Sequence, residues 1–181
     1  MEQGYHTPVL LEESVGLLSV DPAGTYVDLT FGGGGHSRRI LSLLGPEGRL
    51  YGFDQDRDTL ANRPDDGRFH YVESNFRFLR AALRLRGVAQ VDGILADLGV
   101  SSHHFDAVER GFSFRGTALL DMRMNRRGGR TAADVVNTYD RDALTRVLGD
   151  WGELSTPWKV AGCIEPVSYT HLRAHETGRN L

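Results

Sequence analysis

Cysteine and long hydrophobic runs are scarce in this chain of 181 residues. Cys163 is its single cysteine, which excludes an intramolecular disulfide framework and is typical of a reducing compartment. No apolar run approaches the roughly 20 residues that span a bilayer. The first six residues have neither the basic region nor the apolar region of a secretory leader. We therefore expect a cytoplasmic protein without a membrane partner.

An excess of positive charge is also missing. The sequence has 21 Lys and Arg residues against 24 Asp and Glu, a formal net charge of −3. Proteins that hold nucleic acid mainly through phosphate neutralisation are usually basic. Arginines nevertheless cluster in residues 77–86 and 123–130, and their planar side chains suit phosphate groups. Net charge therefore leaves nucleic-acid binding open.

A run of four glycines, Gly32–Gly35, is the most informative feature that is present. It follows an apolar segment, 25–30, and precedes an amphipathic segment, 36–44; a second apolar segment then ends in Asp54. Glycine permits positive φ and close approach of a ligand to the backbone, and a helix N-terminus attracts anions. An acid about 20 residues after the glycines has the spacing of a ribose-binding residue. The pattern predicts a site for a nucleoside-containing cofactor.

The order of the segments predicts the fold class. Further strands are expected over 69–72 and 91–98, with helices over 57–62 and 76–86 and a first helix capped by Thr7 and begun by Pro8. Strands that alternate with short helices favour a parallel, doubly wound α/β sheet. Past residue 99 this alternation stops, and 131–150 reads as one or two helices. Four strands make such a sheet incomplete, so we expect either an unusually small fold or a chain that stops early.

The residues around the glycines narrow the choice of ligand. His36 and Arg38 stand where a phosphate-binding P-loop would have Lys and Ser or Thr, which argues against an NTPase. The glycine spacing of a dinucleotide site is met only loosely. The loop after the fourth expected strand carries Asp97, two serines and two histidines at the carboxyl edge, where ligands bind in open α/β sheets. The alternative is a polar loop in which Asp97 caps neighbouring N–H groups.

Six segments, in order along about residues 5–165, resemble the bacterial MraW/RsmH family of methyltransferases. The segments are 6–10 (HTPVL), 28–37 (DLTFGGGGHS), 52–56 (GFDQD), 97–102 (DLGVSS), 109–114 (ERGFSF) and 120–124 (LDMRM). The family transfers a methyl group from S-adenosyl-L-methionine (SAM) to the N4 amine of a cytidine in 16S rRNA of the small ribosomal subunit. The resemblance implies an N-terminal fragment of such an enzyme.

The resemblance also implies an architecture. The fold would be a Rossmann-like class I SAM-dependent methyltransferase fold with an incomplete parallel sheet and the start of a helical insertion domain. Residues 1–110 would bind SAM, 111–165 would begin the helical insertion on the substrate side, and 166–181 match nothing in the family and are expected to be a non-native tail. Without the later strands, the sheet keeps an exposed edge, so we expect marginal stability. Whether the protein forms a homodimer is left open by the sequence.

The resemblance assigns the cofactor site to a small set of residues. Gly34, Gly35 and His36 would line the methionine end, and Asp54 would accept hydrogen bonds from the ribose hydroxyls. The residues expected near the adenine or near the rest of the cofactor are Phe76, Asp97 and His104, the last standing where the family most often has glutamine.

On the substrate side, the cytidine amine needs a hydrogen-bond acceptor, and the candidates are Asp97 and, more weakly, Asp121. The target must leave its stack to be reached, and Arg123, Arg126 and Arg127 are the expected clamps for flanking phosphates. A pair of methionines, Met122 and Met124, is either core or a contact for the base or the methyl group.

Three other interpretations of the sequence compete with this one. His171 and His175 have the i, i+4 spacing of metal ligands, with Glu176 beside them, but no third ligand is evident and we expect no metal. An NAD-dependent oxidoreductase would use the same kind of fold. A non-catalytic module that binds SAM or RNA without turnover is the remaining alternative.

Overall fold

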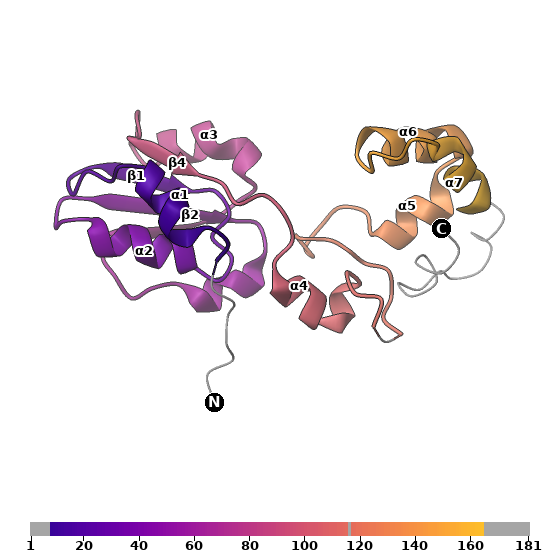
Figure 1. The fold of residues 1–181 in the computed structure, drawn as a ribbon, viewed down its shortest axis with the longest axis horizontal. Helices are drawn as coiled ribbons and strands as arrows, with labels where there is room; N and C mark the ends of the chain where they lie inside the picture. The colour runs from indigo at the N-terminus through magenta and orange to yellow at the C-terminus, as the bar shows by residue number, and fades with distance from the viewer. Residues whose placement is uncertain (1–7, 116, 165–181) are drawn as a thin grey trace. The chain divides into compact units, whose positions relative to one another are not determined.

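The structure is a computed structural model that describes residues 8–115 and 117–164. Contacts divide the chain into two compact units, the first ending at Gly99 and the second beginning at Val100 (Figure 1). This division lies earlier in the chain than the boundary at residue 110 that the sequence predicts between a SAM-binding part and a helical insertion. That functional boundary stays a prediction. The expected non-native tail, 166–181, lies outside the described residues.

The first unit is built on a parallel sheet of four strands in the order β3-β2-β1-β4. The strands are β1 (Thr25–Asp28), β2 (Arg49–Asp54), β3 (Phe69–Glu73) and β4 (Gly93–Leu95). Its helices are α1 (Leu11–Leu17), α2 (Gly35–Leu43), the 3-10 helices η1 (Arg57–Asn62) and η2 (Phe76–Phe78), and α3 (Leu79–Arg84). The predicted α/β class and parallel sheet are confirmed.

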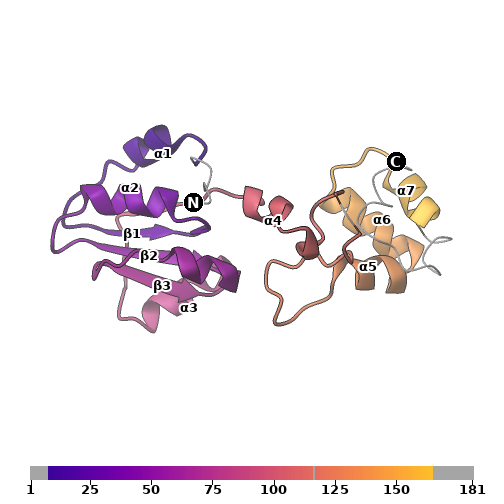
Figure 2. The same cartoon turned by 90° about the horizontal axis from the view of Figure 1, so that it is seen from below.

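Helices cover both faces of this sheet (Figure 2). On one face, α1 and α2 bury Val15, Ile40 and Leu41 against side chains of β1 and β2. On the other face, α3 packs Ala82 and Leu83 on the opposite side of the same strands. The four residues 50–53 of β2 are all buried, because a strand in the middle of a parallel sheet is covered on both faces.

Two helix predictions need correction. The first helix begins at Leu11, not at Pro8: Leu10 is its N-cap in the left-handed conformation (φ 51°), without a side-chain cap. The helix expected over 76–86 begins as the 3-10 turn η2 and becomes α-helical only at Leu79, since the side chain of Asn75 accepts a hydrogen bond from the N–H of Arg77 and tightens the first turn.

The fourth strand is shorter than the predicted 91–98. Beyond Leu95, the backbone N–H of Asp97 donates to the side-chain Oγ1 of Thr30 (2.8 Å) instead of to a carbonyl of β1. The ladder therefore ends at residue 95. Among the described residues β4 pairs only with β1, and Ile94 on it is 45% exposed.

The second unit is helical. Its elements are α4 (Ser102–Asp106), the 3-10 helix η3 (Val108–Arg110), α5 (Ala132–Thr138), α6 (Arg141–Asp150) and α7 (Pro157–Ile164). Thr131 and Asp134 form a capping box for α5, and Asp140 caps α6 by accepting from the N–H of Ala143 (2.7 Å). These caps separate two helices, which confirms the helical prediction for 131–150.

A buried arginine anchors the long connection that precedes α5. Arg110 is 1% exposed, and its guanidinium donates to the carbonyl oxygens of Arg123 (3.0 Å) and Met124 (3.3 Å). Gly111 follows with φ 76°, and a Cβ there would lie 2.6 Å from the backbone N of Asp121. Close packing of two backbone segments therefore requires glycine at this position.

In the described ranges, no helix combines the length and the apolarity needed to cross a bilayer.

Replacement of Gly111 by alanine tests this packing, with Gly129→Ala as a matched control. Both glycines have positive φ, but a Cβ at Gly129 meets nothing within 4 Å. Gly129→Ala should lower the free energy of unfolding by about 1 kcal/mol, and Gly111→Ala by at least about 2 kcal/mol because of the added overlap. Urea unfolding measures both; equal losses would contradict the close contact.

Candidate cofactor site

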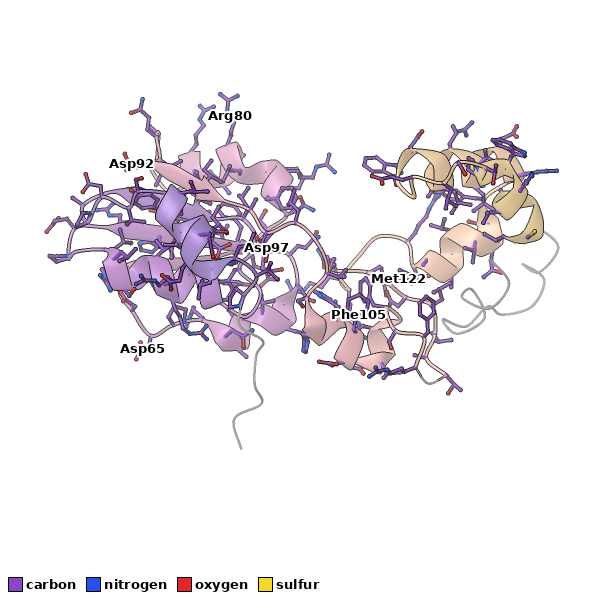
Figure 3. All side chains as sticks on the ribbon, viewed as in Figure 1. Asp65, Arg80, Asp92, Asp97, Phe105 and Met122 are labelled. Atoms are coloured by element: carbon purple, nitrogen blue, oxygen red, sulfur yellow. The ribbon has the colours of Figure 1, made fainter. Side chains whose placement is uncertain are left out.

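The cofactor-site residues predicted within the first unit gather at one edge of its sheet. Because the strands are parallel, their carboxyl ends meet there. The glycine loop follows β1, Asp54 ends β2, Phe76 follows β3, and Asp97 follows β4. Figure 3 shows Asp92 and Asp97 at opposite ends of β4, with Asp97 on the side of the glycine loop. The structure thus brings these predicted residues to one edge; their role in binding a cofactor stays a prediction.

The first glycine of the loop is held by the second strand. The backbone N–H of Gly32 donates to Oδ2 of Asp54 (2.9 Å), and the carbonyl of Gly32 accepts from the side-chain amide of Asn62 (2.9 Å). The N–H of Phe31 donates to the carbonyl of Phe53 (3.0 Å). The carboxylate of Asp54, half-buried, thus lies against the loop that it was predicted to serve.

Two later glycines are required by space. Gly34 has φ 75° and is the N-cap of α2; a Cβ there would lie 2.8 Å from the guanidinium of Arg38 and 2.9 Å from the ring of Phe31. A Cβ on Gly35 would lie 2.2 Å from Cγ of Pro8. Pro8 therefore packs directly on the loop, a contact that sequence reasoning missed because it joins separate segments.

A buried carboxylate supports the loop from below. Asp28 is fully buried; its Oδ2 accepts from the hydroxyl of Ser37 (2.7 Å) and its Oδ1 from the N–H of Thr30 (3.1 Å). Thr30 in turn binds the N–H of Asp97. These bonds join β1, α2 and the loop after β4. Sequence reasoning assigned no role to Asp28, although an acid at a strand end with a serine in the following helix was the available signal.

Burial raises the pKa of the Asp28 carboxyl above its ordinary 3.8, and the hydrogen bonds from Ser37 and Thr30 oppose that rise. The cause is desolvation of the charged form.

His36, in the first turn of α2, carries an unsatisfied polar group. Its side chain is 6% exposed, and Nε2 is buried without a hydrogen-bond partner in the described part of the chain. Buried polar atoms are normally paired. A polar ligand at the N-terminus of α2 would satisfy this atom.

Phe76 and Asp97 have side chains that remain available. The ring of Phe76 is 41% exposed. The carboxylate of Asp97 is exposed, and within residues 8–115 and 117–164 it has no hydrogen-bond partner. The alternative that Asp97 caps neighbouring N–H groups is therefore wrong, since it is the N–H of Asp97 itself that is bound, by Thr30.

The remaining predicted residues lie in the second unit. His104 is buried and shares hydrogen bonds with Ser101 at the start of α4 (Nδ1 to Oγ, 2.8 Å). Asp121 forms a two-pronged ion pair with Arg123 (2.7 and 2.9 Å). This pair holds the pKa of Asp121 below its ordinary value, chiefly through the side-chain hydrogen bond. Asp121 is therefore a weaker proton acceptor than its residue type suggests.

Two arginines of the predicted phosphate clamp, Arg126 and Arg127, are exposed.

Among the described residues, no group of three or more His, Cys, Asp or Glu side chains is arranged to hold a metal ion. The histidine pair at 171 and 175 lies outside those residues.

The sheet order, with the glycine loop after β1 and an acid at the end of β2, defines a Rossmann-like α/β domain. A family model described as the MraW methylase family matches residues 3–176, a range that includes part of the segment 166–181. The chain belongs to the MraW methylase family.

Similar proteins are named ribosomal RNA small subunit methyltransferase H. The one from Bacteroides fragilis is 59% identical over 163 residues, covering 90% of this chain and 54% of the relative. Those from Bacteroides thetaiotaomicron (58%; 90% and 54%) and Porphyromonas gingivalis (55%; 90% and 53%) are comparable. The chain thus spans about half the length of the curated relatives it matches.

The support under the loop is tested with Ser37→Ala and, as its matched control on the same helix, the exposed Ser42→Ala. Ser37→Ala removes a donor from the buried Asp28 carboxylate and should cost about 1–3 kcal/mol. Ser42→Ala should cost less than about 0.5 kcal/mol. Urea unfolding followed by circular dichroism gives both values.

The cost of Ser37→Ala should depend on pH. Because folding raises the pKa of Asp28, this carboxyl adds to the free energy of unfolding at low pH. That contribution is lost as pH rises through the pKa of the folded state. The hydrogen bond from Ser37 opposes this loss because it stabilises the charged carboxylate. The free energy of unfolding of Ser37→Ala should therefore fall furthest below wild type above the folded pKa and approach it as pH falls toward 3.8. A cost independent of pH would contradict a charged Asp28 as the acceptor.

Proposed function

We propose that this chain carries the cofactor-binding part of a methyltransferase that moves a methyl group from SAM to the N4 amine of a cytidine in 16S rRNA. The observation that supports this most is the hydrogen bond between Gly32 and Asp54, which places an acid against a glycine loop at the carboxyl edge of the sheet. Membership of a methylase family and the names of the relatives support the reaction and the RNA.

The residues of this edge fit SAM. Asp54 would accept hydrogen bonds from the ribose hydroxyls, and the exposed ring of Phe76 would stack on the adenine. Gly34 and Gly35 would let the methionine end approach the backbone, with His36 Nε2 available to a polar group of the cofactor. When bound, SAM supplies an electrophilic methyl group on a sulfonium.

The chain's own residues must then act on a poor nucleophile, because the lone pair of the cytosine amine is delocalised into the ring. Orientation of the amine can supply much of the rate, and an acceptor for its N–H stabilises the charge that builds on nitrogen. The exposed carboxylate of Asp97 is the acceptor we propose. Asp121 is the weaker candidate, since both of its oxygens bind Arg123.

On the RNA side, we assign Arg126 and Arg127 to phosphates that flank the extruded cytidine. The guanidinium of Arg123 binds Asp121 within the same loop. Its role is therefore to hold the loop that presents the other two arginines.

A second candidate is a module that binds SAM or RNA without turnover. It is favoured by the contacts of the glycine loop with Asp54 and Asn62, which bear on binding and not on turnover. The glycine loop would serve binding alone in that case.

Transfer of labelled methyl from SAM to small-subunit RNA tests the proposal, with N4-methylcytidine as the expected product. Phe76→Ala should raise the KM for SAM by about tenfold, since a stacked base is worth about 1–3 kcal/mol. Phe78→Ala, in the same turn and also exposed, should change it less than twofold. Binding of SAM without label in RNA would favour the non-catalytic module, and equal effects of the two variants would contradict the role of Phe76.

A further inference from the structure

A recess lies in the first unit, away from the cofactor loop. It has a volume of about 860 Å³ and is lined by the starts of β2 and β3, the loops that precede these strands, and Arg86. None of the glycine loop, Asp54, Phe76 or Asp97 lines it. Its walls include the amino ends of parallel strands, at the sheet edge opposite the cofactor site. Its volume is within the range of ligand pockets.

Basic side chains converge on one wall of this recess. Arg49 and Tyr51 lie on the same face of β2 because side chains alternate along a strand, and Tyr51 packs in the cluster with α3. Tyr51 pairs in register with His70, and their rings stack at 4.9 Å. Arg86 follows α3 and donates to the carbonyl of Ala82 (2.8 Å). Two guanidiniums thus flank one imidazole on the α3 face.

The electrostatics at His70 agree with this placement. Desolvation lowers the pKa of His70 below 6.5, and the charges of Arg49 and Arg86 lower it further. The imidazole is therefore mostly neutral at pH 7, within reach of the positive charges of Arg49 and Arg86.

The acids that line the recess are engaged or set apart. Asp66 pairs with Arg68 (2.6 Å), which lowers the pKa of Asp66 to about 2. Asp65 is exposed (Figure 3) and, in the described ranges, forms no ion pair with an arginine of the lining. Glu47 is exposed and, in the described ranges, forms no ion pair with Arg49 or Arg86. The fourth arginine on the lining, Arg63, is exposed and adds positive charge.

We propose that Arg49, His70 and Arg86 form a phosphate-binding site in this recess, separate from the cofactor edge. The guanidiniums supply charge and paired N–H donors suited to phosphate oxygens, and the neutral imidazole supplies a further donor. The phosphate group bound here would belong either to the backbone of RNA or to a free phosphate compound. The assignment to RNA rests on the proposed function.

The test compares two double variants that remove equal charge. Arg49→Gln with Arg86→Gln alters the site. Arg80→Gln with Arg84→Gln alters exposed arginines of α3 that do not line the recess. Binding of a 12-nucleotide single-stranded RNA should weaken about tenfold or more in the first variant and less than threefold in the second. The slope of log affinity against log salt should fall by about 1 or more only in the first.

A second readout separates the two sources. NMR titration of His70 should show its pKa rising on ligand addition, because an anion favours the charged imidazolium. A rise with inorganic phosphate and with RNA supports recognition of the phosphate group from either source; a rise with RNA alone assigns the site to RNA. No rise with either probe, together with equal RNA binding by the two double variants, would overturn the proposal.

Titration of SAM into the same proteins keeps the two proposals apart. The site variant should bind SAM with unchanged affinity. Failure of wild type to bind SAM would count against the proposed function and leave the phosphate result standing.

Discussion

The buried carboxylate of Asp28 is the constraint on which the cofactor edge depends. An isolated charge in the interior is costly, so Asp28 requires donors, and it takes them from Ser37 and Thr30. Meeting that need fixes the start of α2 relative to the end of β1. Because Thr30 also binds the N–H of Asp97, the same requirement positions the loop after β4.

The loop above this support is held from two sides. Asp54 and Asn62 hold Gly32 from the direction of β2, while Pro8 packs on Gly35 from the N-terminal side. A site with its glycines already held loses little conformational entropy when a ligand binds. In this part of the described chain, Nε2 of His36 is the only buried polar side-chain atom without a hydrogen-bond partner. His36 lies in the first turn of α2.

Local pattern was enough to predict the sheet, the glycine loop and Asp54, because strand and helix periodicity and turn chemistry are properties of short segments. The short β4 and the 3-10 start of the helix after β3 each depended on a single hydrogen bond, and the late start of α1 accompanies the left-handed backbone of Leu10. The contact of Pro8 with Gly35 was not predictable from pattern because it joins separate segments. The pairing of Asp121 with Arg123 accompanies a left-handed Met122 between them, which a non-glycine residue rarely adopts. The ion pair with Arg123 makes Asp121, which the sequence had offered as a hydrogen-bond acceptor for the substrate amine, a weaker candidate for that role.

The most direct test of the account is a calorimetric titration of SAM into the chain, with NADH as the competing cofactor type. We expect saturable binding of SAM and none of NADH. Asp54→Asn should weaken SAM binding by about tenfold or more, whereas Asp65→Asn, an exposed acid away from the cofactor edge, should leave it unchanged. Tighter binding of NADH, or equal SAM affinity in the two variants, would contradict the assignment of this edge to SAM.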